Sequence, residues 1–152
     1  MSFKFKISLL SLIGIIGLLW GVSFLRTHSD KKPFLTINKQ KIFLEVAKTA
    51  EEHERGLSYR ENIPINQGML FIFAKSGNYS FWMKDMKFDL DFIYINGSII
   101  VDVVENVPYP KSSEQPKIIV AKHEFDKVLE VNSGTINRLK IKIGDKAEYS
   151  FD

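Results

Sequence analysis

The stretch "FDLDFIYINGSIIVDVV", residues 88–104, decides the fold class. Polar and apolar residues alternate at its start, as they do in a β-strand that packs one face on a core. Asn96 and Gly97 form the dipeptide most typical of a tight hairpin, in a type I′ turn. The stretch therefore predicts two antiparallel strands, over residues 88–95 and 98–104.

Strand signals continue on both sides of this hairpin. A continuous apolar run, "GMLFIF", predicts a strand buried on both faces. Short runs of branched and aromatic residues, bounded by turn residues, predict further strands. These predicted strands cover residues 34–37, 41–47, 68–73, 79–83, 117–121, 128–131 and 147–151.

One clear helix signal interrupts the strands, "TAEEHERG" at residues 49–56. Thr49 suits the N-cap, Glu52 completes a capping box, and Gly56 suits the residue after the last turn. With one short helix and no repeated strand–helix rhythm, the sequence predicts a mainly β fold, a compact antiparallel β-sandwich or open barrel.

The first part of the chain has a different composition. Residues 1–32 hold five of the 21 basic and one of the 18 acidic residues, so residues 33–152 carry one net negative charge. Residues 7–25 carry no charge and are long enough to cross a bilayer as a helix. We expect residues 1–26 to be an anchor or signal segment and residues 27–33 to be a linker to a β-rich domain, residues 34–152.

An uncleaved anchor is favoured over a cleaved signal. The best cleavage position, after Ser23, would leave Phe24 and Leu25 at the new N-terminus, which is a poor match to a signal peptidase site. The chain has no cysteine, which excludes a lipoprotein anchor. We expect a membrane-anchored protein with its domain outside the cytoplasm, in the cell envelope or periplasm; the alternative is a protein secreted after cleavage.

Familiar catalytic and cofactor motifs are missing from the sequence. It contains no nucleophile elbow, phosphate loop, dinucleotide fingerprint or zinc-protease motif. We therefore expect no cofactor. A near-neutral domain lacks the basic stripe that nucleic acids require, so nucleic acid is not an expected partner. Asp89 and Asp91 lack a third acidic ligand, so no metal site is expected.

Two polar clusters are candidate sites. Arg55 and Arg60 flank the end of the predicted helix and can clamp a carboxylate or phosphate; the alternative is that they pair with nearby acids and hold helix to sheet. In the second cluster, Trp82 is either a ligand-binding floor or a core residue, and Lys84 lies next to it. Asp91 either serves a site or pairs with a basic residue at the end of the sheet.

Three longer stretches carry a resemblance to a known family. They are "ERGLSYRENIPINQGMLFIF", "SFWMKDMKFDLDFIYIN" and "VLEVNSGTINRLKIKIGD". They resemble the bacterial and archaeal domain-of-unknown-function 192 family, whose pattern runs GLMYR, GMLF, FWMKNT, PLD, LE and GD. The resemblance covers residues 41–151. It implies a jelly-roll-like β fold, often behind an export signal, and no established activity.

The chain departs from that pattern at four positions: Ser58, Asp85, Met86 and Asp89. In place of an asparagine and a threonine that can donate hydrogen bonds, Asp85 offers only acceptors and Met86 offers no donor. If those two residues contact a ligand in the family, the hydrogen bonding there differs in this chain.

The sequence therefore leads to one main hypothesis and two alternatives. In the main one, the domain binds a small polar ligand or a protein partner without catalysis, in a concavity lined by Arg55, Arg60, Trp82, Lys84 and Asp91. The first alternative is a hydrolase-like enzyme that uses Asp91 or Asp89 as acid or base. The second is a structural accessory module of a membrane complex.

Overall fold

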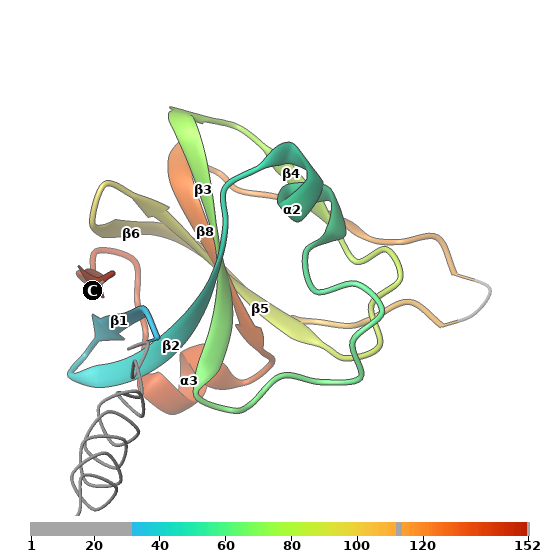
Figure 1. Ribbon diagram of the computed structural model, residues 1–152, viewed down its shortest axis with the longest axis horizontal. Coiled ribbons are helices and arrows are strands. Elements are labelled where there is room, and N and C mark those ends of the chain that lie inside the picture. The colour runs from blue at the N-terminus through green and yellow to red at the C-terminus, as the bar shows by residue number, and fades with distance from the viewer. Residues whose placement is uncertain (1–31, 112–113, 152) are drawn as a thin grey trace, which may run out of the picture. The chain divides into compact units, whose positions relative to one another are not determined.

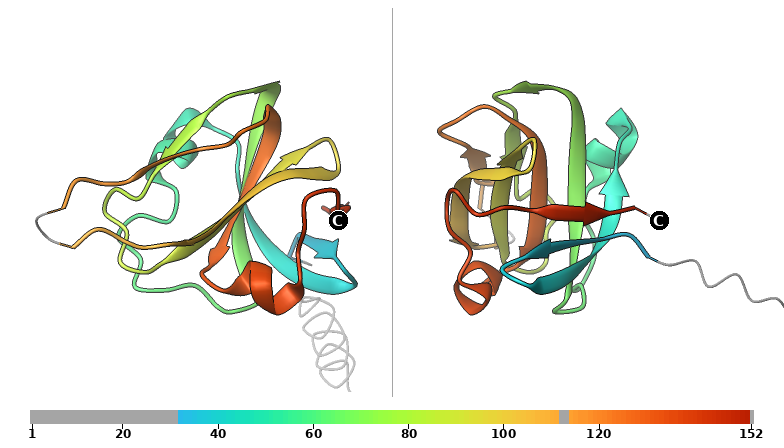
Figure 2. Two further views of the ribbon diagram at one scale, coloured as in Figure 1. Left: turned by 180° about the vertical axis from the view of Figure 1, so that it is seen from behind. Right: turned by 90° about the vertical axis from the view of Figure 1, so that its left-hand side faces the viewer.

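The computed structural model describes residues 32–111 and 114–151. They form a mainly β domain, which confirms the predicted class, with one seven-stranded sheet in the order β6-β5-β8-β3-β2-β1-β9 and a separate pair, β4-β7. The large sheet curls into a half-barrel (Figures 1 and 2). The strands are β1 (Phe34–Ile37), β2 (Gln40–Ala47), β3 (Gln67–Gly77), β4 (Ser80–Trp82), β5 (Leu90–Asn96), β6 (Ile99–Val107), β7 (Ile118–Val120), β8 (Phe125–Asn132) and β9 (Glu148–Ser150).

The predicted membrane segment, residues 1–26, lies outside the described residues, as does most of the predicted linker. Within the described part of the chain, no helix is long and apolar enough to cross a bilayer.

The predicted hairpin of residues 88–104 is present, as β5 paired antiparallel with β6. Its turn differs from the prediction: Asn96 is opposite Ile99, so the two turn residues are Gly97 and Ser98. Only Gly97 has a positive φ, 62°, which fits type II′, so the predicted type I′ turn is wrong. The Asn96 amide donates hydrogen bonds to the Ser76 hydroxyl and the Glu124 carbonyl, which keeps Asn96 in the strand.

In residues 32–111 and 114–151, two short helices accompany the strands. The predicted helix is α2 (Ala50–Arg55), with Thr49 as N-cap and a complete capping box to Glu52. The helix α3 (Thr135–Leu139) follows β8. Because α2 carries the chain across between β2 and β3, these two strands pair in parallel, in a sheet whose other pairs are antiparallel (Figure 1).

The large sheet is covered on both faces. Along β5, Leu90, Phe92 and Tyr94 face one apolar cluster, and Ile93 and Ile95 face another. We call the first the aromatic core, because it contains most of the buried rings, and the second the barrel core. The aromatic core lies under α2 and the β4-β7 pair, and it is this side that carries the candidate site.

Candidate functional site

Two of the family-like motifs meet at the surface between α2 and the turn after β4. The Tyr59 amide donates to the Asp85 carbonyl at 2.8 Å, and the Ser58 hydroxyl donates to the Lys84 carbonyl at 3.0 Å. The Tyr59 hydroxyl also donates to the Asp85 carboxylate at 2.7 Å, a bond that raises the pKa of Tyr59. These hydrogen bonds hold "GLSYR" against "FWMKD".

The contact uses two residues in a conformation that side chains seldom adopt. Tyr59 has φ 65° and Asp85 has φ 57°. A positive φ suits aspartate or asparagine, but for a bulky residue such as tyrosine it is unusual and costs free energy. Backbone in this conformation is concentrated at binding sites in proteins, which makes this contact a candidate functional feature.

A shallow depression of about 250 Å³ lies at this contact. We call it the outer groove. One wall comes from α2 and the loop after it, and the other from β4 and its turn. Its lining residues are Glu51, Glu54, Arg55, Ser58, Tyr59, Trp82, Lys84 and Asp85.

Trp82 and Lys84 form the β4 side of the outer groove. Trp82 is 49% exposed, so it is not a core residue. The Lys84 ammonium lies 5.1 Å from the centre of the Trp82 ring, a cation–π distance. No carboxylate among the described residues makes a salt bridge with Lys84.

Arg55 forms part of the opposite wall. Its guanidinium donates to Glu51, one turn earlier on α2, at 2.8 Å. Both side chains are largely exposed, so water screens the pair and it contributes little to stability. A ligand in the groove can therefore compete with Glu51 for Arg55 at low cost.

Arg60 lies outside the outer groove. Its two terminal nitrogens bind both carboxylate oxygens of Glu45 on β2, at 2.8 and 2.7 Å, and Gln67 donates to the same carboxylate. The hydrogen bond from Arg60 lowers the pKa of Glu45 and raises that of Arg60. This arrangement matches the alternative in which the arginine holds the loop after the helix to the sheet.

Asp91 is fully buried, away from Lys84. Its carboxylate accepts backbone N–H bonds from Asn106 on β6 at 2.8 Å and from Ile136 in α3 at 2.9 Å. Lys84 and Asp91 thus neither face a shared cleft nor pair with each other. The structure brings Arg55, Trp82 and Lys84 together and places Arg60 and Asp91 elsewhere.

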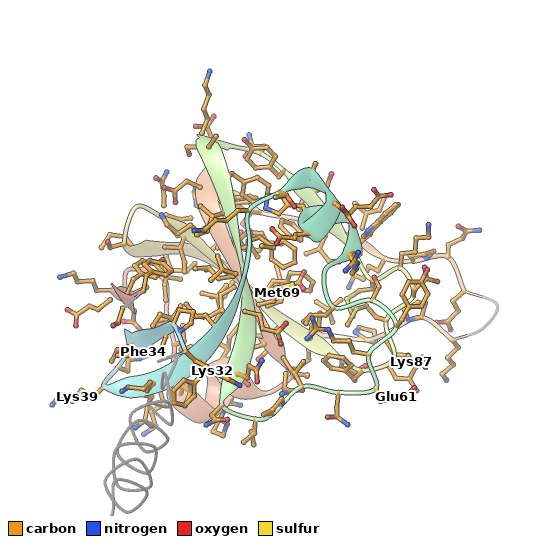
Figure 3. The ribbon with its side chains drawn as sticks, in the orientation of Figure 1. Lys32, Phe34, Lys39, Glu61, Met69 and Lys87 are labelled. Carbon is orange, nitrogen blue, oxygen red and sulfur yellow. The ribbon has the colours of Figure 1, made fainter. Side chains whose placement is uncertain are left out.

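The neighbouring charges do not make a site around Asp91 either. Asp89 accepts the Tyr109 N–H at 2.9 Å, and Lys87 pairs with Glu61 (Figure 3). In the described residues, no three His, Cys, Asp or Glu side chains are placed to hold a metal ion.

Sequence reasoning missed Glu130 as a site residue. It lies on β8 between Met69 of β3 (Figure 3) and Phe92 of β5, its direct neighbours across the sheet. Glu130 is 5% exposed, and its carboxyl group has no hydrogen-bond partner among the described residues. Burial raises its pKa to about 8, so the carboxyl group is mostly protonated at neutral pH.

Glu130 lines a small cavity of about 30 Å³ beneath the outer groove. We call it the inner cavity. Apart from Glu130, the sheet contributes apolar side chains, and α2 and its loop close the space from above. The lining residues are His53, Glu54, Arg55, Gly56, Leu57, Ser58, Phe71, Phe81, Trp82, Met86, Leu90 and Glu130.

The sequence did contain a signal for Glu130. In "VLEV" the glutamate stands inside an apolar run predicted to be a strand, where an acid is rarely buried unless it is paired or functional. Gly68 allows β3 to lie close to the backbone of Glu130 on β8. A Cβ atom on Gly68 would lie 2.7 Å from the Glu130 carbonyl oxygen. A side chain at residue 68 would therefore push β3 away from β8.

Known proteins show the same motifs and the same fold. The model of the DUF192 family, described as "Uncharacterized ACR", matches residues 34–149. The chain belongs to the DUF192 family. No curated protein matches this DUF192 chain.

Two solved structures resemble the DUF192 domain. A Sinorhizobium meliloti protein, provisionally named a transcription regulator, is 30% identical, with a TM-score of 0.68 over 78% of this chain and 92% of its own. A Novosphingobium aromaticivorans protein of unknown function is also 30% identical, with a TM-score of 0.67 over 76% of this chain and 83% of its own. These similarities establish the fold, and neither relative has an established function that could be compared with the site of this chain.

Proposed function

We propose that this DUF192 protein is a membrane-anchored or exported β-domain that binds a small polar ligand in the outer groove, outside the cytoplasm, without catalysis. The apolar segment at residues 7–25 supports the location. The meeting of Arg55, Trp82 and Lys84 in one depression supports the binding role.

The proposal rests mainly on the surroundings of the Lys84 ammonium group. Its ammonium lies over a half-exposed tryptophan ring and makes no salt bridge among the described residues. A flat apolar surface beside a cation that is available for pairing fits a ligand with a carboxylate and a short apolar part. Arg55 provides a second donor on the other wall.

The hydrolase-like alternative needs Asp91 or Asp89 as a free acid or base, and neither carboxylate is free. The carboxylates of Asp89 and Asp91 are both held by backbone N–H groups, and Asp91 has no exposed surface. A nucleic-acid role does not follow from the name of the Sinorhizobium protein, because residues 33–152 carry one net negative charge.

A second candidate function is docking of a protein partner, as an accessory module would require. The β4-β7 pair turns Trp82, Ile118 and Val120 outward, and all three are exposed. Trp82 and Ile118 are direct cross-strand neighbours, so they form a continuous apolar surface. Trp82 belongs to this surface and to the outer groove alike.

Ligand binding is tested with valerate, a carboxylate with a short apolar tail, titrated calorimetrically into the full-length chain in detergent. We expect weak binding that Lys84→Ala reduces about ten-fold, because one charge-assisted contact is lost. Lys142→Ala, at an exposed lysine outside the groove, is the control and should bind like the wild type. If the wild type does not bind valerate, or Lys84→Ala binds it equally well, the proposed site is wrong.

A further inference from the structure

The inner cavity and the outer groove adjoin each other. Glu54, Arg55, Ser58 and Trp82 line both spaces. A ligand seated against Trp82 can therefore extend one narrow end toward Glu130. At about 30 Å³ the inner cavity holds about two water-sized groups, so only the tip of a ligand fits there.

On its sheet side, the inner cavity presents one acid, Glu130, among apolar groups. The helix α2 and the loop after it add Glu54, Arg55 and Ser58 on the other side. Phe71 and Phe81, which pack edge to face at 5.3 Å between ring centres, contribute aromatic surface. On the α2 side, His53 already has a partner, since its Nε2 lies 3.0 Å from the Ala47 carbonyl oxygen. On the sheet side, the Glu130 carboxyl group is thus the polar group that can meet a ligand.

A carboxyl group beside aromatic rings favours a ligand that brings hydrogen-bond donors and positive charge. A buried carboxylate alone is costly, but an ammonium group compensates its charge, and aromatic faces attract cations. At the rim, the two cations Lys84 and Arg55 suit a carboxylate. Three acids line the same groove, and two of them already accept hydrogen bonds: Glu51 from Arg55 and Asp85 from Tyr59. The combined space therefore suits a molecule with a positive charge at its inner end and a negative charge at its outer end.

We propose that this DUF192 protein binds a small zwitterion, an ω-amino acid, with its ammonium group at Glu130 in the inner cavity and its carboxylate at Lys84 and Arg55 in the outer groove. This inference rests on the proposed function and specifies the ligand class. Glu130 binds as the carboxylate, so it gives up its proton to solvent when the ammonium group arrives.

Other titratable groups near Glu130 are few. His53, Glu54 and Arg55 reach the inner cavity from α2. Tyr94 on β5 is buried, and its hydroxyl group has no hydrogen-bond partner in the part of the chain that the structure describes. Burial, together with the nearby Glu130, raises the pKa of Tyr94. Since the pKa of Glu130 is about 8, the free protein holds a proton there at pH 6 to 7 that the complex does not hold.

The test compares 5-aminovalerate with valerate, which has the same five-carbon chain and lacks the amine. We expect the full-length wild type in detergent to bind 5-aminovalerate at least about ten-fold more tightly, because a buried ion pair is gained. Glu130→Gln should remove this difference, because the ammonium group then loses its charged partner. If valerate does not bind at all, the proposed function fails; if valerate binds and 5-aminovalerate binds no more tightly, only the present inference fails.

A proton count on the wild type gives a second test that needs no variant. Calorimetry at about pH 6.5 in buffers of different ionisation enthalpy measures the protons released on binding. We expect close to one proton released with 5-aminovalerate and none with valerate. Equal proton counts for the two ligands, or Glu130→Gln that keeps the preference for the amine, would overturn the zwitterion assignment.

Discussion

Three acids of the large sheet are buried, and they differ in what surrounds their carboxyl groups. Asp91 and Asp102 each accept two backbone N–H bonds, which replace the water that burial removes. Glu130 accepts none among the described residues and sits between two apolar neighbours. Asp91 and Asp102 therefore join strands and loops, whereas Glu130 weakens the core that contains it, as groups kept for binding commonly do.

Glu130→Gln should change the pH dependence of stability. The pKa of Glu130 is about 8 in the fold against an ordinary 4.5, so the unfolded chain loses this proton first as pH rises. The free energy of unfolding then falls, by up to about 1.4 kcal/mol per pH unit. Glutamine has no proton to lose. We expect the variant to become more stable than the wild type between pH 5 and 8, measured by urea unfolding.

Glu45→Gln is the matched control for that measurement, because its effect runs the other way. Arg60 lowers the pKa of Glu45, so the stability that this pair contributes is present above pH 4.5 and is lost as pH falls below it. The deficit of Glu45→Gln should shrink in acid. A parallel pH dependence for the two variants would show that Glu130 is not a buried neutral acid.

Among the elements, α3 and β6 are joined to β5 through Asp91. The carboxylate meets the Ile136 N–H in the first turn of α3 and the Asn106 N–H in β6, where φ of Asn106 is 52°. One side chain thus accepts hydrogen bonds from the backbone of two elements that lie far apart in the sequence. The carboxylate at this position is an architectural feature of the half-barrel.

Asp91→Asn should destabilise the domain by about 2 kcal/mol, because an amide can accept only one of the two N–H bonds and its NH2 group opposes the other. Asp89→Asn, at an exposed residue just before β5, should cost less than about 0.5 kcal/mol. Thermal unfolding of both variants checks this. Equal melting temperatures for the two variants would show that the buried hydrogen bonds of Asp91 contribute little.

Sequence patterns predicted the elements better than their contacts. The capping box of α2 and the alternation in β5 are local, so they could be predicted from neighbouring residues. The parallel pairing of β2 with β3 depends on where α2 packs, and the turn at Gly97 depends on partners of Asn96 that lie about 20 to 28 residues away.

The candidate site shows the same limit. Arg55, Trp82 and Lys84 were predicted to share a concavity, and the structure places them around one groove. Arg60 and Asp91 carry the same residue types as a site would, but each finds its partners in segments distant along the chain. Chemical type alone does not distinguish a side chain that binds a ligand from one that holds strands together.

The proposed function places the domain outside the cytoplasm. Alkaline phosphatase fused after Asp152 reports this in a bacterial host, because that enzyme folds only outside the cytoplasm. We expect an active fusion that stays in the membrane fraction after carbonate washing, because residues 7–25 are uncharged and long enough to span a bilayer as a helix. The same fusion without residues 1–31 should be inactive. An active fusion found in the soluble fraction would favour the cleaved signal instead.

The position of β1 has a mechanical consequence for such a protein. The chain enters the sheet at Phe34, and β1 is an inner strand, with four residue pairs to β2 and three to β9. The carbonyl of Pro33 also accepts the Leu44 N–H. If the protein is anchored through the residues before Phe34, a pulling force on the domain would be carried by hydrogen bonds on both sides of β1. The strand β1 could then not separate from the sheet without also releasing β9.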